Sequence, residues 1–165
     1  MTSKKATLWN NYDLPEETKF AVIELLNRQL ADAIDLGLQA KQAHWNVKGP
    51  QFLSLHALFD ETAGLIGGIT DELAERAVSL GGMASGTLQI VSATSRLPVY
   101  PADVFSGPDH LKPLSGSLSQ FSKSAREAIG AVSALGDAVS ADLFTEIAIT
   151  TDKILWKVES HLFQE

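Results

Sequence analysis

Cysteine is absent from this chain of 165 residues, which excludes disulfide bonds and thiolate ligands for a metal. Any metal site would therefore use His, Asp and Glu, a donor set that suits iron or manganese better than structural zinc. No apolar run approaches the roughly 20 residues of a membrane-spanning helix, so we expect no membrane association. The first five residues have no apolar segment behind them that would form a secretory signal, and a soluble cytoplasmic protein is expected.

Positive charge is also scarce, because 13 basic residues face 20 acidic ones and the net charge is −7. This balance argues against an extensive nucleic-acid-binding surface and is compatible with attracting cations. Gly-rich phosphate loops and internal repeats are missing too. So are the Glu-x-x-His motifs that hold di-iron sites inside helix bundles, and this absence favours a metal site at an interface.

Apolar residues recurring at intervals of three and four predict four long helices, at about residues 14–47, 50–80, 115–135 and 141–163. Pro15 and the acids after it are typical of a helix start, and Gly81-Gly82 is typical of a helix end. Pro113 should delay or kink the third helix, and Ser140 should cap the last. We interpret residues 1–13 as a flexible arm and residues 14–165 as one helical domain.

A long connection, residues 83–108, separates the second and third predicted helices. Within it, residues 87–92 fit either a strand or a short helix, and the pattern leaves this open. Connections of this length usually carry their own structure or a function. Four long helices with one long connection favour an all-α four-helix bundle with a crossover.

Five side chains able to bind a metal gather between residues 44 and 75. The break at Gly49-Pro50 places the first at the end of one helix and the other four on the next. Two pairs on that next helix are each four residues apart, and eleven residues between the pairs make about three turns, so all four lie along one stripe. The five are His44, His56, Asp60, Asp71 and Glu75.

The stripe separates its two pairs by about 16 Å, whereas metal–ligand bonds are about 2 Å long. One helix therefore cannot bring both pairs to one ion, but an antiparallel copy of the helix in a second subunit can. The two-fold axis should cross near Leu65 and Ile66, flanked by Gly64, Gly67 and Gly68, where glycine allows close backbone approach. The alternative explanation for the acids is an ordinary solvated helix face. The alternative for the glycines is that the helix simply tolerates them, although each costs about 1 kcal/mol of helix stability relative to alanine.

These residues resemble the Dps family (DNA-binding protein from starved cells), which are small ferritin-like proteins. The resemblance extends from about residue 20 to the C-terminus. It implies a ferritin-like four-helix bundle whose long connection carries a short helix on its outer face. The matching segments are Lys41–Phe52, Leu55-His56, Phe59-Asp60, Asp71–Arg76, Gly81-Gly82, Tyr100-Pro101, Asp109–Leu111 and Asp152–Trp156.

The resemblance implies Fe(II) oxidation, preferably by hydrogen peroxide, and storage of ferric mineral in a hollow shell of twelve subunits, which protects DNA and the cell. The five groups would be ferroxidase ligands shared across the two-fold interface. Asp60 and Glu75 would hold the tighter iron, the two histidines would complete the ligand shells, and Asp71 would bind directly or through water. Trp45 would absorb oxidising equivalents beside the iron, unless it is only a partly buried interface aromatic.

The same resemblance places acidic residues near three-fold pores through which Fe(II) enters the shell. Asp142 and Glu146, at the start of the last helix, are the candidates, and Asp137 is a weaker one. A capping and helix-dipole role is the alternative for the first two.

Other polar residues are interpreted as structural. Asp32 and Asp35 should be solvated. Lys48 and Arg76 should each form a structural ion pair. His110 and His161 should be surface or packing residues.

The main competing function is a DNA-compacting, nucleoid-associated protein in which iron binding is secondary. The arm offers only Lys4 and Lys5, and the C-terminus has no basic tail, so DNA binding should be weak or absent. Twelve copies of the arm would still add avidity. A third possibility is a helical oligomer that binds zinc or no metal.

Overall fold

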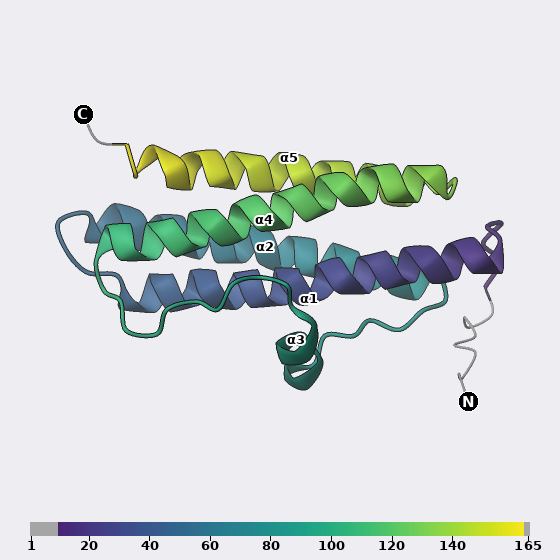
Figure 1. Cartoon of the computed structure of the whole chain (residues 1–165), viewed down its shortest axis with the longest axis horizontal. Helices are drawn as coiled ribbons and strands as arrows, with labels where there is room; N and C mark the ends of the chain where they lie inside the picture. Colours follow the sequence, from purple (N-terminus) through teal and green to yellow (C-terminus); the bar gives the residue numbers. More distant parts are fainter. Residues whose placement is uncertain (1–9, 164–165) are drawn as a thin grey trace.

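The computed structural model describes residues 10–163, which form five helices and, within that range, no strand. The helices are α1 (Glu16–Asn46), α2 (Phe52–Ser79), α3 (Leu88–Thr94), α4 (Gly107–Ala134) and α5 (Ala138–Ser160). Figure 1 shows the four long helices side by side and the short α3 on the connection between α2 and α4. The predicted all-α four-helix bundle with a crossover is confirmed, and the ambiguous segment is a helix.

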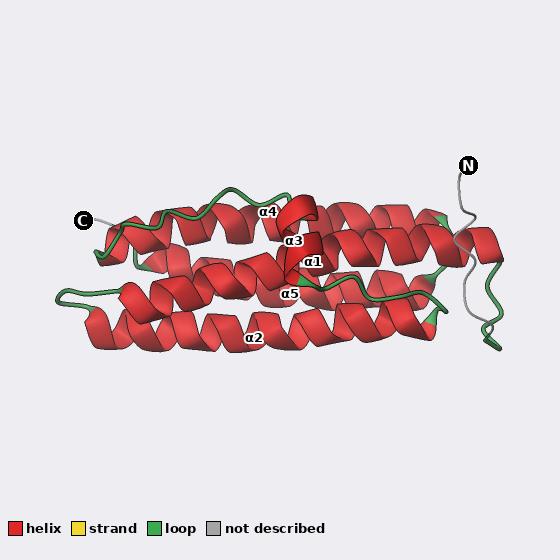
Figure 2. Ribbon diagram, turned by 90° about the horizontal axis from the view of Figure 1, so that it is seen from below, coloured by secondary structure: helices red, strands yellow, loops and turns green. Residues whose placement is uncertain are grey.

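The four long helices bury one apolar stripe each against a shared core. The α1–α2 and α4–α5 hairpins pack as two pairs, and the connection returns along the bundle with α3 against α1 (Figure 2). The largest fully buried side chains come from all four long helices. They include Leu26, Leu30, Phe59, Leu73, Phe121 and Phe144. Burying side chains of this size, at about 1.5–3 kcal/mol each, is what holds the two hairpins together.

Two predicted helix ends are wrong. The α4 helix begins at Gly107 rather than near Ser115, because the Ser106 hydroxyl caps it by accepting from the Asp109 N–H, and Pro108 fits the first turn, where no N–H donor is needed. Pro113 lies inside the helix. The cap of α5 is Asp137, whose carboxylate accepts from the Ser140 N–H at 3.0 Å.

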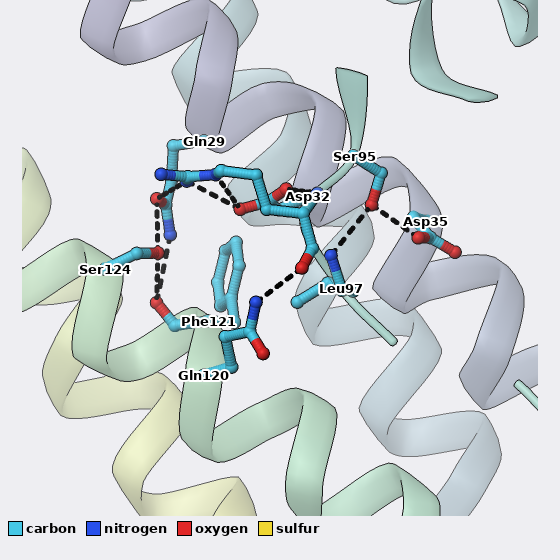
Figure 3. A network of polar contacts seen from close by, with 9 residues as sticks. Gln29, Asp32, Asp35, Ser95, Leu97, Gln120, Phe121 and Ser124 are labelled. Carbon is cyan, nitrogen blue, oxygen red and sulfur yellow. Dashed lines mark hydrogen bonds and ion pairs between the residues drawn. The ribbon is translucent and has the colours of Figure 1, made fainter. Parts of the chain in front are cut away.

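The predicted solvation of Asp32 is also wrong, since this α1 carboxylate is 1% exposed. Arg96, on the returning connection, donates to it from its backbone N–H at 2.8 Å and from its guanidinium at 2.6 and 3.0 Å. Asp35, partly buried, accepts from the Ser95 hydroxyl at 2.5 Å. Figure 3 shows both carboxylates facing the connection. The connection is therefore fastened to α1 by hydrogen bonds that satisfy buried charge.

Arg76 forms the structural ion pair that its sequence position suggested. Its guanidinium donates to both carboxylate oxygens of Asp137 at 3.0 and 3.1 Å and to the Tyr12 hydroxyl at 2.6 Å. Asp137 is 2% exposed within the chain and is held by Arg76, so it has a structural role here, and its weaker candidacy for a pore stays a prediction. Lys48 instead lies over the Phe105 ring, 4.9 Å from its centroid, and has no ion pair within residues 10–163.

The predicted arm is only partly described, because residues 1–9 lie outside the described residues. Its last residues contact the bundle. The Asn10 amide donates to the Ser79 carbonyl at 3.4 Å, and Tyr12 bonds to Arg76. Residues 10–12 are thus attached near the end of α2.

Candidate metal centre

Two histidines meet where α1 ends and α2 begins. Gly49, with φ of 113°, lets the chain reverse between them, a conformation that favours glycine. The rings of His44 and His56 stack with centroids 3.7 Å apart. Each Nδ1 lies 2.8 Å from the backbone carbonyl oxygen of the other histidine. These reciprocal bonds orient both rings and leave the Nε2 atoms as the ones able to bind a metal.

Asp60 lies one turn beyond His56 on α2, with its carboxylate 3.9 Å from His44 Nε2. The Lys41 ammonium donates to the same carboxylate at 2.5 Å. That hydrogen bond is the main reason why the pKa of Asp60 lies below its usual 3.8, so the exposed carboxylate is charged at neutral pH. Lys41 was missed by the sequence reasoning, although its position one turn before His44 on the same helix was a usable signal.

The other two candidate ligands stand apart from this group. Asp71 and Glu75 are both exposed and lie about three turns further along α2. Within residues 10–163 of a single chain, the structure contains no group of three or more His, Asp or Glu side chains placed to hold one ion. The five candidates therefore do not meet at one point within the described part of a single chain.

The surface between the two groups is open within one chain. A Cβ atom added at Gly64, Gly67 or Gly68 would meet no neighbouring atom within 4 Å. Leu65, among them, is 41% exposed, and Trp45 beside the histidines is 66% exposed. Among residues 10–163, no neighbouring atom requires glycine at these three helical positions, and the large apolar side chain of Leu65 faces outward between them.

The two pore candidates lie in the first turns of α5. Asp142 and Glu146 are both exposed, one turn apart, and the structure of one chain shows no partner for either that would define a pore. Their role at a pore stays a prediction.

His110 should make stability depend on pH. Burial lowers its pKa below 6.5, outweighing Asp109 and the Val104 carbonyl, which raise it. The unfolded chain therefore takes up this proton first, so the contribution of neutral His110 is complete above about pH 6.5 and is lost as the pH falls toward the folded pKa. Between about pH 7 and pH 5, His110→Gln should lose less of its free energy of unfolding than the wild type, as measured by urea titration. His161→Gln is the control, and equal losses in all three proteins would contradict the assignment.

No helix within residues 10–163 combines the length and apolar character needed to cross a membrane.

Comparison with known proteins places the fold and the chain in one family. Residues 23–164 match the Ferritin-like domain family. The DNA protection during starvation protein of Agrobacterium fabrum is 44% identical over 150 residues, covering 91% of this chain and 93% of that protein. The solved structure of DpsC from Streptomyces coelicolor superposes with a TM-score of 0.93 at 28% identity, covering 100% of this chain and 97% of that one. Mycobacterium smegmatis Dps gives a TM-score of 0.90 at 31% identity, covering 94% and 95% of the two chains. The chain therefore belongs to the Dps family of ferritin-like proteins.

Proposed function

We propose that this protein is a ferroxidase that oxidises Fe(II), preferably with hydrogen peroxide, and stores the ferric product inside a homododecameric shell. The observation that carries the proposal is the division of the ligand set on α2. His44, at the end of α1, meets His56 and Asp60 at one end of α2, and the exposed Asp71 and Glu75 lie about three turns further along that helix. An antiparallel copy of α2 would bring the two ends together at two equivalent sites, one on each side of the axis.

The chemistry follows from the donor set. Imidazole Nε2 atoms bind Fe(II), and carboxylates add negative charge that favours Fe(III) once it forms. Fe(II) at Asp60 would replace the Lys41 ammonium as the partner of that carboxylate. Two Fe(II) ions give one electron each to hydrogen peroxide, whose O–O bond breaks, and two protons complete two water molecules. Because both electrons go to one peroxide, hydroxyl radicals are largely avoided, which protects DNA and the cell.

The direct test is stopped-flow oxidation of Fe(II) by the purified, metal-free protein, with peroxide and with dioxygen as separate oxidants. We expect rapid oxidation with peroxide at two Fe(II) per site, slower oxidation with dioxygen, and soluble ferric mineral at higher loading. Metal analysis is run on the same sample. Tight zinc occupancy without acceleration of Fe(II) oxidation would favour the helical oligomer that binds zinc or no metal.

The three α2 glycines should matter to assembly and not to the fold of one chain. Gly64→Leu and Gly68→Leu place large side chains where a second α2 would approach, so we expect the shell to dissociate into smaller species. The helical content should persist, because leucine favours helix over glycine by up to about 1 kcal/mol. Light scattering coupled to size exclusion measures the mass, and circular dichroism measures the helicity.

Matched controls lie on α4. Gly116 and Gly130 are also helical glycines whose added Cβ atoms would meet nothing within 4 Å. Their alanine variants separate general effects of glycine removal from effects at the α2 face. An intact shell in the Gly64→Leu, Gly68→Leu double variant would overturn the antiparallel α2 interface.

We propose further that Asp142 and Glu146 guide Fe(II) into the shell. Both are exposed acids at the start of α5, where they attract divalent cations. Trp45, exposed beside the histidines, is proposed to take up oxidising equivalents that escape the iron site.

DNA binding is the second candidate function, because the Agrobacterium relative is named for DNA protection. We expect it to be weak at neutral pH, since twelve chains of net charge −7 give a shell of about −84 that repels phosphate. Deleting residues 1–8, which include Lys4 and Lys5, should remove residual binding and leave Fe(II) oxidation intact. Gel shifts across a salt series measure this, because phosphate contacts weaken steeply with salt. Tight binding at physiological salt after the deletion would favour the DNA-compacting function.

A further inference from the structure

A tyrosine and a histidine that the proposed ferroxidase site does not use are joined by a hydrogen bond at the base of the connection. The Tyr100 hydroxyl lies 2.9 Å from Nδ1 of His110, and the two rings are nearly parallel, at 15° with centroids 6.1 Å apart. The same hydroxyl is 3.4 Å from the His110 carbonyl oxygen, a longer contact. When the hydroxyl donates to Nδ1, the ring proton of the neutral imidazole resides on Nε2.

His110 is unusually placed for a histidine. It is 1% exposed, and its Nε2 atom is buried with no partner at full hydrogen-bond geometry among the described residues, although the Val104 carbonyl acts on the imidazole by raising its pKa. A buried polar atom of this kind costs about 1–3 kcal/mol and calls for a reason. Packing alone does not provide one, since a phenylalanine would fill similar space without the orphaned N–H.

The protonation states of the pair suit a proton transfer that is coupled to loss of an electron. Burial raises the pKa of Tyr100, so the phenol keeps its proton at neutral pH. Burial lowers the pKa of His110, so the imidazole is neutral and its Nδ1 is free to accept. A phenol loses an electron far more readily when a base takes its proton at the same time, and Nδ1 is such a base at hydrogen-bond distance.

The pair also contacts the helix that carries Asp60. The His110 ring meets the Phe59 ring edge-on, with centroids 6.2 Å apart. Phe59 is fully buried and precedes Asp60 on α2. Successive residues of a helix point about 100° apart, so Phe59 connects the buried side of α2 that His110 contacts with the exposed side that carries Asp60.

We propose that Tyr100 donates an electron to oxidants formed at the iron site, with His110 Nδ1 receiving the phenolic proton. This role rests on the proposed ferroxidase function, which supplies the oxidant: a hydroxyl radical formed when one Fe(II) meets peroxide alone. The radical takes the electron and becomes hydroxide, the phenolic O–H bond breaks, and His110 becomes an imidazolium beside the Tyr100 phenoxyl radical. A later Fe(II) returns one electron to the phenoxyl, the proton returns from Nδ1, and Fe(III) is the product.

A tyrosyl radical can be assigned to one residue by substitution, because Tyr12 and Tyr100 are the only tyrosines in the sequence. The assembled protein is loaded with less than one Fe(II) per site, mixed with peroxide and freeze-quenched for electron paramagnetic resonance. We expect a tyrosyl radical in the wild type and in Tyr12→Phe, and none in Tyr100→Phe. A tyrosyl signal that survives Tyr100→Phe and disappears in Tyr12→Phe would overturn the proposal.

The role of His110 is tested in the Tyr12→Phe background by adding His110→Gln, which retains a polar side chain but no base. We expect the tyrosyl yield to fall about tenfold or more, in the range of a lost proton acceptor. An unchanged yield would show that the histidine only packs against Phe59. Thermal melts of each variant confirm that the comparison is between folded proteins.

A second measurement separates this inference from the ferroxidase proposal. In metal-free protein, azide radicals made by pulse radiolysis oxidise aromatic side chains without iron. Tyr12→Phe should still form a phenoxyl radical, and adding His110→Gln should suppress it. If these radicals form but the iron reaction does not, the ferroxidase proposal fails while the redox pair stands. If Tyr12→Phe forms no phenoxyl radical by this route, the pair is not an electron donor.

Discussion

Replacing Asp60 and Glu75 together by alanine is expected to abolish fast Fe(II) oxidation while the shell stays assembled. The two carboxylates are the proposed ligands of the tighter iron, and one would come from each subunit. Altering a group that only supports a metal ligand typically costs 10–100-fold in affinity or activity, so loss of two direct ligands should cost more than about 100-fold. Stopped-flow oxidation with peroxide gives the rate, and light scattering gives the mass of the assembly.

Glu72→Ala is the matched control, because Glu72 is an exposed acid on the same helix that lies outside the ligand set. Its oxidation rate should equal that of the wild type. Wild-type rates in the Asp60→Ala, Glu75→Ala variant would show that the ligands are assigned wrongly. If the Asp60→Ala, Glu75→Ala variant fails to assemble while Glu72→Ala assembles normally, these two carboxylates also stabilise the α2 interface.

The second large effect is expected at Arg76, whose loss should destabilise the fold far more than the loss of an arginine in an exposed ion pair. Its side chain is 10% exposed and is paired with Asp137, which is 2% exposed. The pKa of Asp137 lies below 3.8: burial raises it, but hydrogen bonds from Ser140 and Arg76 lower it by more. Arg76→Ala leaves this buried carboxylate without its counter-charge, at a cost of about 3–5 kcal/mol. Thermal unfolding should show a fall of about 2–4 °C for each kcal/mol.

The control is Arg126→Ala, which removes an ion pair of similar geometry at the surface. Arg126 and Asp152 are both 51% exposed and 2.8 Å apart. Exposed pairs are worth about 0–1 kcal/mol, so the unfolding temperature should change little. Equal effects of the two substitutions would mean that burial of the Arg76 pair does not decide its contribution.

Several features were predictable because the physics that decides them is local. The break between α1 and α2 follows from Gly49-Pro50, and the end of α2 follows from Gly81-Gly82. The candidate ligands could be placed on one helix face from spacing alone, because a helix repeats every 3.6 residues. The same arithmetic predicts that a single α2 cannot close the site, and this stays a prediction.

Other features depended on partners that are distant in sequence. Arg96 lies 64 residues from Asp32, so no local pattern reveals that it neutralises that buried acid. Tyr100 and His110 are close in sequence, but only the packing of the histidine against Phe59 of α2 buries it. The predicted start of α4 is wrong because the Ser106 hydroxyl caps the helix ahead of Pro113, which lies inside it.

By itself, the sequence determined four amphipathic helices, their order, and one stripe of possible iron ligands on the second helix. These features follow from backbone periodicity and from the conformational limits of glycine and proline, which act within a few residues. Only the tertiary structure decided which carboxylates are exposed to bind a cation and which are buried against arginine, as Asp60 and Asp137 show. The physical reason is that the free-energy cost of burying a charged group depends on the partner that the rest of the fold places beside it. The packing of distant segments, and not the spacing of residues in the sequence, sets that partner.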